Sequence, residues 1–114
     1  MTDKAIKYLS DIQYSISLVD EFLKGVENFL AYQADLKTQS AIERQLGIIG
    51  EAINKLKQEE NMVILSHTKQ IVNFRNRLIH SYDNIDASIV WAILKNHLPV
   101  LKSEVDSMMK DILT

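Results

Sequence analysis

Between positions 75 and 82 the sequence reads Arg-Asn-Arg-Leu-Ile-His-Ser-Tyr, its densest gathering of groups that can hold a phosphate or move a proton. An arginine guanidinium offers a forked set of donors that suits a phosphate. A histidine transfers protons near neutral pH. No cysteine, glycine-rich loop or carboxylate cluster elsewhere in the chain competes with this segment. We therefore expect any chemistry of this protein to centre on it.

Helical geometry constrains how these side chains can cooperate. Arg75 and Tyr82 share a stripe if the helix continues that far, and Asn76 and His80 share a neighbouring one. Arg75 and His80 are separated by about 140° around the helix axis, which is wide for one compact site. We expect fraying at the helix end, or a second subunit, to bring the two groups together.

Apolar residues recur at helical spacing along most of the chain. The pattern predicts one long first helix from the N-terminus to about Tyr32, with Gly25 tolerated inside it. A second helix is expected over 38–57, and it carries Gly47 and Gly50. Glycine is unfavourable inside a helix, so this pair predicts close approach of another helix. The alternative is that the bare backbone leaves room for a ligand or a subunit.

The second half of the chain predicts further helices. Ser66 is a candidate cap for the helix that carries the chemical segment, and Asp86 for the helix after it. Pro99 favours a kink or a fresh helix start, with the proline in its first turn. The expected fold is an all-α, up-and-down bundle of four to five helices forming a single domain over 1–114.

Composition narrows the classes of function. The net charge of −2 over 114 residues does not suit a general nucleic-acid binder, which would usually be basic. However, residues 61–82 contain no acid, and Lys69, Arg75 and Arg77 give this stretch a charge of +3. One local anion site on an acidic body is therefore expected. The chain has no long apolar run and no cysteine, so we expect a cytoplasmic protein without a membrane span.

The histidines do not suggest a metal site. His67, His80 and His97 lack a tight ligand spacing, and no carboxylate cluster adjoins the motif. We expect neither a metal nor another cofactor.

Three residues of the segment form a recognisable signature. Arg75, His80 and Tyr82 fit the pattern Arg-x4-His-x-Tyr, and the chain resembles the HEPN domains, in particular the HepT-like ribonuclease toxins. The Ile-Gly-Glu-Ala sequence at 49–52 is similar to the second helix of that family. Trp91 and the sequence Leu-Pro-x-Leu at 98–101 are similar to its C-terminal part. The resemblance covers most of the chain from about Ser40 onward.

The resemblance implies a metal-independent endoribonuclease and the toxin half of a toxin–antitoxin pair. In such a HEPN-like homodimer, two Arg/His motifs lie beside one cleft. His80 would transfer protons, Arg75 would stabilise charge on the phosphate, and Asn76 would support them. The implied partner is a minimal nucleotidyltransferase (MNT) antitoxin that transfers AMP to Tyr82 and silences the toxin, in a complex that can be a larger hetero-oligomer.

Two other functions remain open at the level of sequence. One is a non-catalytic nucleotide- or substrate-binding subunit of a nucleotidyltransferase, which needs the anion site but no titrating group. The other is a structural helical adaptor, in which the motif is only surface chemistry. Replacing His80 with alanine discriminates the three, because only the ribonuclease would lose cleavage.

Overall fold

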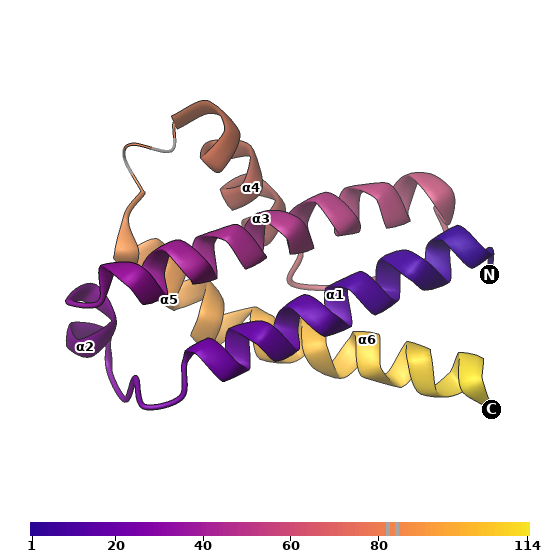
Figure 1. Ribbon diagram of the computed structural model, residues 1–114. Helices are drawn as coiled ribbons and strands as arrows, with labels where there is room; N and C mark the ends of the chain where they lie inside the picture. The colour runs from indigo at the N-terminus through magenta and orange to yellow at the C-terminus, as the bar shows by residue number, and fades with distance from the viewer. Residues whose placement is uncertain (82, 84) are drawn as a thin grey trace.

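Six helices follow one another in the computed structural model, which describes residues 1–81, 83 and 85–114. No strand occurs in those ranges, so the predicted all-α fold is confirmed. The helices are α1 (Asp3–Phe22), α2 (Phe29–Gln33), α3 (Leu36–Glu59), α4 (Lys69–Ser81), α5 (Ala87–Asn96) and α6 (Leu98–Leu113). The long helices α1, α3 and α6 lie side by side, with α1 and α3 running in opposite directions (Figure 1).

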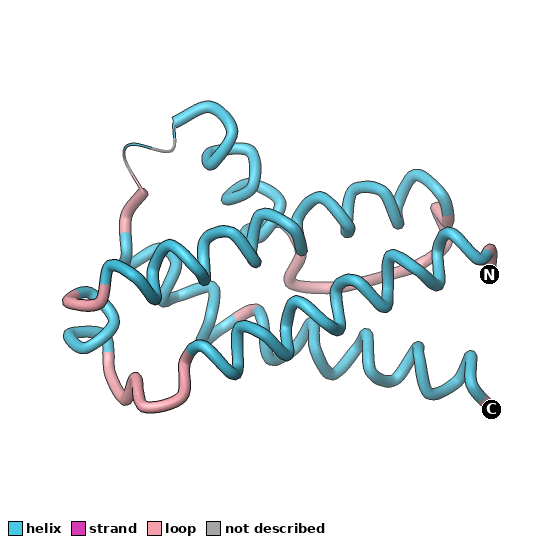
Figure 2. Tube along the Cα trace, in the orientation of Figure 1, coloured by secondary structure: helices cyan, strands magenta, loops and turns pink. Residues whose placement is uncertain are grey.

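The prediction of a single long first helix is wrong. Figure 2 shows a loop between α1 and α2, and α1 ends at Phe22. Gly25 has a φ of +84°, a left-handed conformation that glycine adopts readily and that breaks a helix. Asn28 then starts α2, because its side chain accepts a hydrogen bond from the Ala31 amide at 2.9 Å. This division gives six helices where four to five were expected.

Most other helix boundaries follow local capping chemistry. Asp35 caps α3, which begins two residues before the expected Thr38. The predicted cap at Asp86 is confirmed, since its carboxylate accepts from the amide and the hydroxyl of Ser88 at 2.8 and 2.7 Å. These hydrogen bonds hold the pKa of Asp86 below its usual range. Pro99 lies in the first turn of α6, as predicted.

The prediction that Ser66 caps the helix of the chemical segment, α4, is wrong. The helix begins at Lys69, and the Ser66 hydroxyl instead donates to the Glu104 carboxylate of α6 at 3.0 Å. The Ser66 amide donates to the same carboxylate, also at 3.0 Å. This contact ties the loop that precedes α4 to the last helix.

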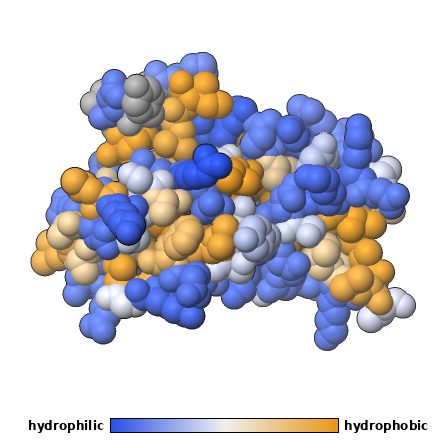
Figure 3. All heavy atoms as spheres, viewed as in Figure 1, coloured by the Kyte–Doolittle hydropathy of each residue, from blue (hydrophilic) through white to orange (hydrophobic). Residues whose placement is uncertain are grey.

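Aliphatic side chains from five of the helices meet in one core, which α2 joins through Tyr32. The buried apolar residues of α1 repeat at helical spacing, namely Ala5, Leu9, Ile12, Ile16 and Val19. On the face drawn in Figure 3, hydrophobic residues also reach the surface between hydrophilic ones. Within the described residues, none of the helices has the length and apolarity needed to cross a bilayer.

Candidate functional site

A groove of about 480 Å³ lies between α1, α3 and α4, and Arg75 is part of its wall. We call it the α1/α3/α4 groove. Apolar groups from α3 and α4, including Ile48 and Ile79, line it together with charged groups from all three helices. The charged lining residues are Lys7, Asp11, Arg44, Glu51, Lys55 and Arg75. Arg75 therefore shares this groove with charged groups of both neighbouring helices.

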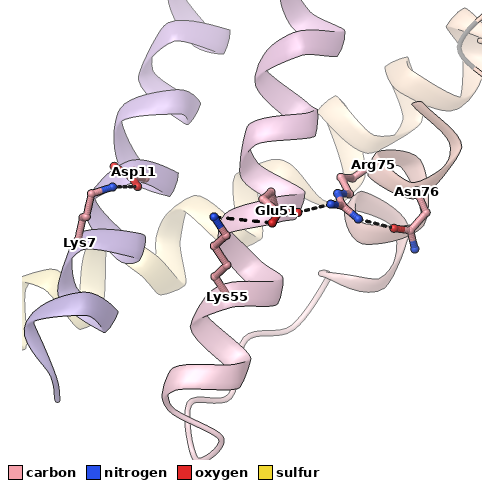
Figure 4. A network of polar contacts seen from close by, with 6 residues as sticks. All are labelled: Lys7, Asp11, Glu51, Lys55, Arg75 and Asn76. Atoms are coloured by element: carbon pink, nitrogen blue, oxygen red, sulfur yellow. Dashed lines mark hydrogen bonds and ion pairs between the residues drawn. The ribbon is translucent and has the colours of Figure 1, made fainter. Parts of the chain in front are cut away.

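The Arg75 guanidinium is held by two partners, as Figure 4 shows. One terminal nitrogen, Nη2, forms an ion pair with Glu51 Oε2 of α3. The other, Nη1, donates to Asn76 Oδ1 at 3.1 Å. Glu51 also lies 3.8 Å from the Lys55 ammonium. These contacts hold the guanidinium, and the Arg75 side chain as a whole is 27% exposed, so it remains partly open to solvent.

The predicted close approach at Gly47 and Gly50 is confirmed, and the neighbouring helix is α4. A Cβ atom at position 50 would lie 2.6 Å from Arg75 Cβ and 3.2 Å from the Ile71 carbonyl oxygen. A Cβ atom at position 47 would lie 3.1 Å from Leu78 Cδ1. The stem of Arg75 therefore lies directly over the bare backbone of Gly50.

The other predicted site residues are placed differently. Asn76 contacts Arg75, but His80 is exposed on the last turn of α4 and is not among the described residues that line the groove. Because α4 stays helical through both positions, Arg75 and His80 keep the wide angular separation expected from their spacing. One copy of the chain therefore does not gather both groups in this groove. Tyr82 lies outside the described residues.

Two features of the structure were not anticipated from the sequence. Glu51 was not identified as a site residue, although it adjoins the glycine that permits the close approach. His67 and His97, 30 positions apart, meet with their Nδ1 atoms at 2.9 Å. His67 reaches this position with a φ of 57°, unusual for a residue other than glycine. Within residues 1–81, 83 and 85–114, no three histidine or carboxylate side chains are grouped as a metal site requires.

Comparison with known proteins places the chain in a family. The family model "Ribonuclease HepT-like" matches residues 12–108. The chain is 33% identical to "Probable ribonuclease HepT" of Thermococcus cleftensis, over 90% of this chain and 94% of that protein. Two "Putative RNase" proteins of Methanocaldococcus jannaschii are also similar to this chain. One is 36% identical over 92% of this chain and 87% of its own length, and the other 32% identical over 93% and 98%.

No solved structure gives a significant match to the chain. The family model nevertheless covers most of the sequence, and these relatives align along nearly their whole length. Helices are the regular secondary structure of the described residues, as the resemblance implied. The chain therefore belongs to the HepT-like ribonucleases, a family of the HEPN type.

Proposed function

We propose that this protein is a metal-independent endoribonuclease whose catalytic residues are Arg75 and His80. RNA carries its own nucleophile, the 2′-hydroxyl, which attacks the adjacent phosphorus while the 5′-oxygen leaves. His80 transfers protons at these oxygens. Arg75 stabilises the negative charge that develops on the phosphorane. Asn76 supports the site by holding the Arg75 guanidinium.

One observation carries this proposal beyond family membership. Arg75 is the motif residue whose charge is oriented by defined contacts and remains partly open to solvent, as a phosphate ligand must be. His80 is exposed further along the same helix, where an RNA strand can reach it. The acidic net charge agrees with recognition limited to such a local site.

The wide angle between Arg75 and His80 favours a homodimer. Cleavage needs both a base and an acid, and each copy supplies one histidine from its motif. Two copies that face each other through α4 would supply two histidines and two arginines to one cleft. The exposed Ile79, which lies between the two catalytic residues in sequence, offers apolar area for such a contact.

The resemblance to the HepT-like toxins also implies a mode of regulation. We propose that the protein is the toxin of a toxin–antitoxin pair and that a minimal nucleotidyltransferase partner silences it by transferring AMP from ATP to the Tyr82 hydroxyl, with release of pyrophosphate. The added phosphate charge and adenosine bulk, two residues from His80, would exclude RNA from the site. Intact mass after co-expression with such a partner tests this step, and an unmodified Tyr82 in a silenced complex would contradict it.

The first experiment is cleavage of a mixed RNA pool by purified protein in excess EDTA, beside His80→Ala. We expect cleavage by the parent and a rate about 10²–10⁴-fold lower for the variant, the usual contribution of a general acid or base. A matched control is His67→Gly, which removes an exposed histidine outside the motif. Its backbone has a φ of 57°, which glycine adopts without strain.

The outcomes separate the alternatives. Equal cleavage by parent and His80→Ala would refute the assignment of His80. No cleavage by a parent whose mass shows an unmodified Tyr82 would favour a non-catalytic binding subunit, and retained partner binding by His80→Ala would support that reading. A parent that neither cleaves RNA nor binds a nucleotidyltransferase would point to a structural adaptor.

A further inference from the structure

Glu51 is a charged side chain of the α1/α3/α4 groove that the catalytic proposal leaves without a role. It belongs to α3, whereas Arg75 and Asn76 belong to α4, so its ion pair with Arg75 joins two helices. It exists because the two backbones are close at Gly50, where a Cβ atom would lie 2.6 Å from Arg75 Cβ. The stem of Arg75 therefore lies on Gly50 of α3, and its guanidinium binds Glu51, the next residue of α3.

The contacts around the guanidinium restrict its rotation. Glu51 binds Nη2 and Asn76 accepts from Nη1, so the two ends of the planar fork are held by different helices. A guanidinium has further N–H donors beyond these two. Asn76 is adjacent to Arg75 in sequence and moves with the same helix turn. Glu51 is therefore the contact that fixes the fork relative to the body of the bundle.

The ion pair is a poor candidate for a purely stabilising contact. The Glu51 side chain is 39% exposed and that of Arg75 is 27% exposed. Ion pairs with this much access to water usually contribute little to the stability of a protein. A carboxylate beside a phosphate ligand also weakens phosphate binding by charge repulsion. The contact is therefore unfavourable for RNA affinity and nearly neutral for folding, which leaves orientation of the guanidinium as its physical effect.

We propose that Glu51 is a positioning residue, which aims the Arg75 guanidinium at the phosphate undergoing cleavage. This inference rests on the proposed ribonuclease function. It predicts an unusual separation of kinetic parameters. Loss of the carboxylate releases the arginine and lowers kcat, while the net charge near the phosphate becomes more positive and KM for RNA falls or stays the same.

The test compares Glu51→Gln with Asp11→Asn. Asp11 lines the same groove and its side chain is 41% exposed, but its ion pair is with Lys7, one turn earlier on α1. Both substitutions remove one negative charge and keep the side-chain size. We expect kcat to fall about 10–100-fold in Glu51→Gln, as small displacements of a catalytic group do. Asp11→Asn should not lower kcat, whatever its charge does to KM.

A second measurement observes the arginine directly. In ¹⁵N NMR spectra of the parent, the Arg75 terminal nitrogens should give separate signals, because the two contacts slow rotation about the Nε–Cζ bond. Arg75→Lys assigns these signals. They should average in Glu51→Gln and remain separate in Asp11→Asn. A melting temperature close to the parent value shows that Glu51→Gln has folded.

The outcomes distinguish this inference from the function on which it rests. An active parent with unchanged kcat in Glu51→Gln, or equal losses in both variants, would overturn the positioning role and leave the ribonuclease intact. A higher kcat in Glu51→Gln would also overturn it, since the carboxylate would then compete with RNA for the arginine. If the unmodified parent itself fails to cleave RNA, the proposed function fails and the positioning role falls with it.

Discussion

Helix α3 packs against α1 in one way and against α4 in another. Towards α1, it forms part of a core built from aliphatic side chains, including Leu9 and Ile12. Towards α4, it presents Gly47 and Gly50, so the α4 side chains rest on α3 backbone. Aliphatic packing supplies stability and tolerates adjustment, whereas a backbone contact fixes position and tolerates little. The difference indicates that stability and the placement of Arg75 depend on separate contacts of one helix.

The largest loss of stability is expected on the α1 side of this comparison. Leu9 is fully buried, and Leu9→Ala should lower the free energy of unfolding by about 2–5 kcal/mol, because it removes buried area and leaves a cavity. Urea unfolding measures this change. Cleavage per folded molecule should remain close to the parent value, since the contact between α4 and α3 is unchanged.

The matched control for Leu9→Ala is Leu36→Ala. Leu36 is 74% exposed at the start of α3, so its truncation should change the free energy of unfolding little. If Leu9→Ala abolished cleavage in protein that remains folded, the α1 contact would also position the site, and the separation of the two roles would fail.

A smaller loss of stability with a larger loss of activity is expected for Gly50→Ala. Alanine is the better helix former by about 1 kcal/mol. However, its Cβ would lie 2.6 Å from Arg75 Cβ and 3.2 Å from a backbone oxygen, so α4 must shift. Overpacking of this kind usually costs about 1–3 kcal/mol. We expect a net loss of up to about 2 kcal/mol in urea unfolding, the overpacking cost less the gain in helix propensity.

The functional effect of Gly50→Ala follows from the atom it would displace. A shift of α4 moves the Arg75 stem and disrupts the ion pair between Glu51 and the guanidinium. We expect kcat to fall at least about tenfold in folded protein. A variant that is destabilised but fully active would show that Arg75 is not placed by this contact.

The sequence predicted most helices and two of their starts better than it predicted the surroundings of Arg75. Periodic apolar residues identified the helices, and Asp86 and Pro99 marked two helix starts, because these signals are local. The break at Gly25 was missed, because apolar residues at helical spacing continue past it in the sequence, whereas its positive φ is visible only in the structure. The pairing of Glu51 with Arg75 was also missed, because it depends on how two helices cross.

The same limit applies to the contact between His67 and His97. Their meeting at 2.9 Å depends on the loop before α4 reaching the junction of α5 and α6, which no local pattern describes. The glycine pair was informative for the opposite reason. Glycines inside a helix need a neighbour that comes close, so their positions predicted an interhelical contact before the identity of the neighbour was known.

The smallest effect is expected for Gly47→Ala, which tests whether the two glycines of the α3–α4 contact differ in their tolerance of a side chain. The new Cβ would lie 3.1 Å from Leu78 Cδ1, which is the end of a flexible side chain and can move by a few tenths of an ångström. The gain in helix propensity, about 1 kcal/mol, should offset this crowding. We expect the free energy of unfolding to stay within about 0.5 kcal/mol of the parent or to rise slightly, with kcat unchanged. Equal destabilisation by Gly47→Ala and Gly50→Ala would mean that the whole face of α3 is intolerant of side chains. Opposite signs would restrict that intolerance to the one position where the stem of Arg75 rests on backbone.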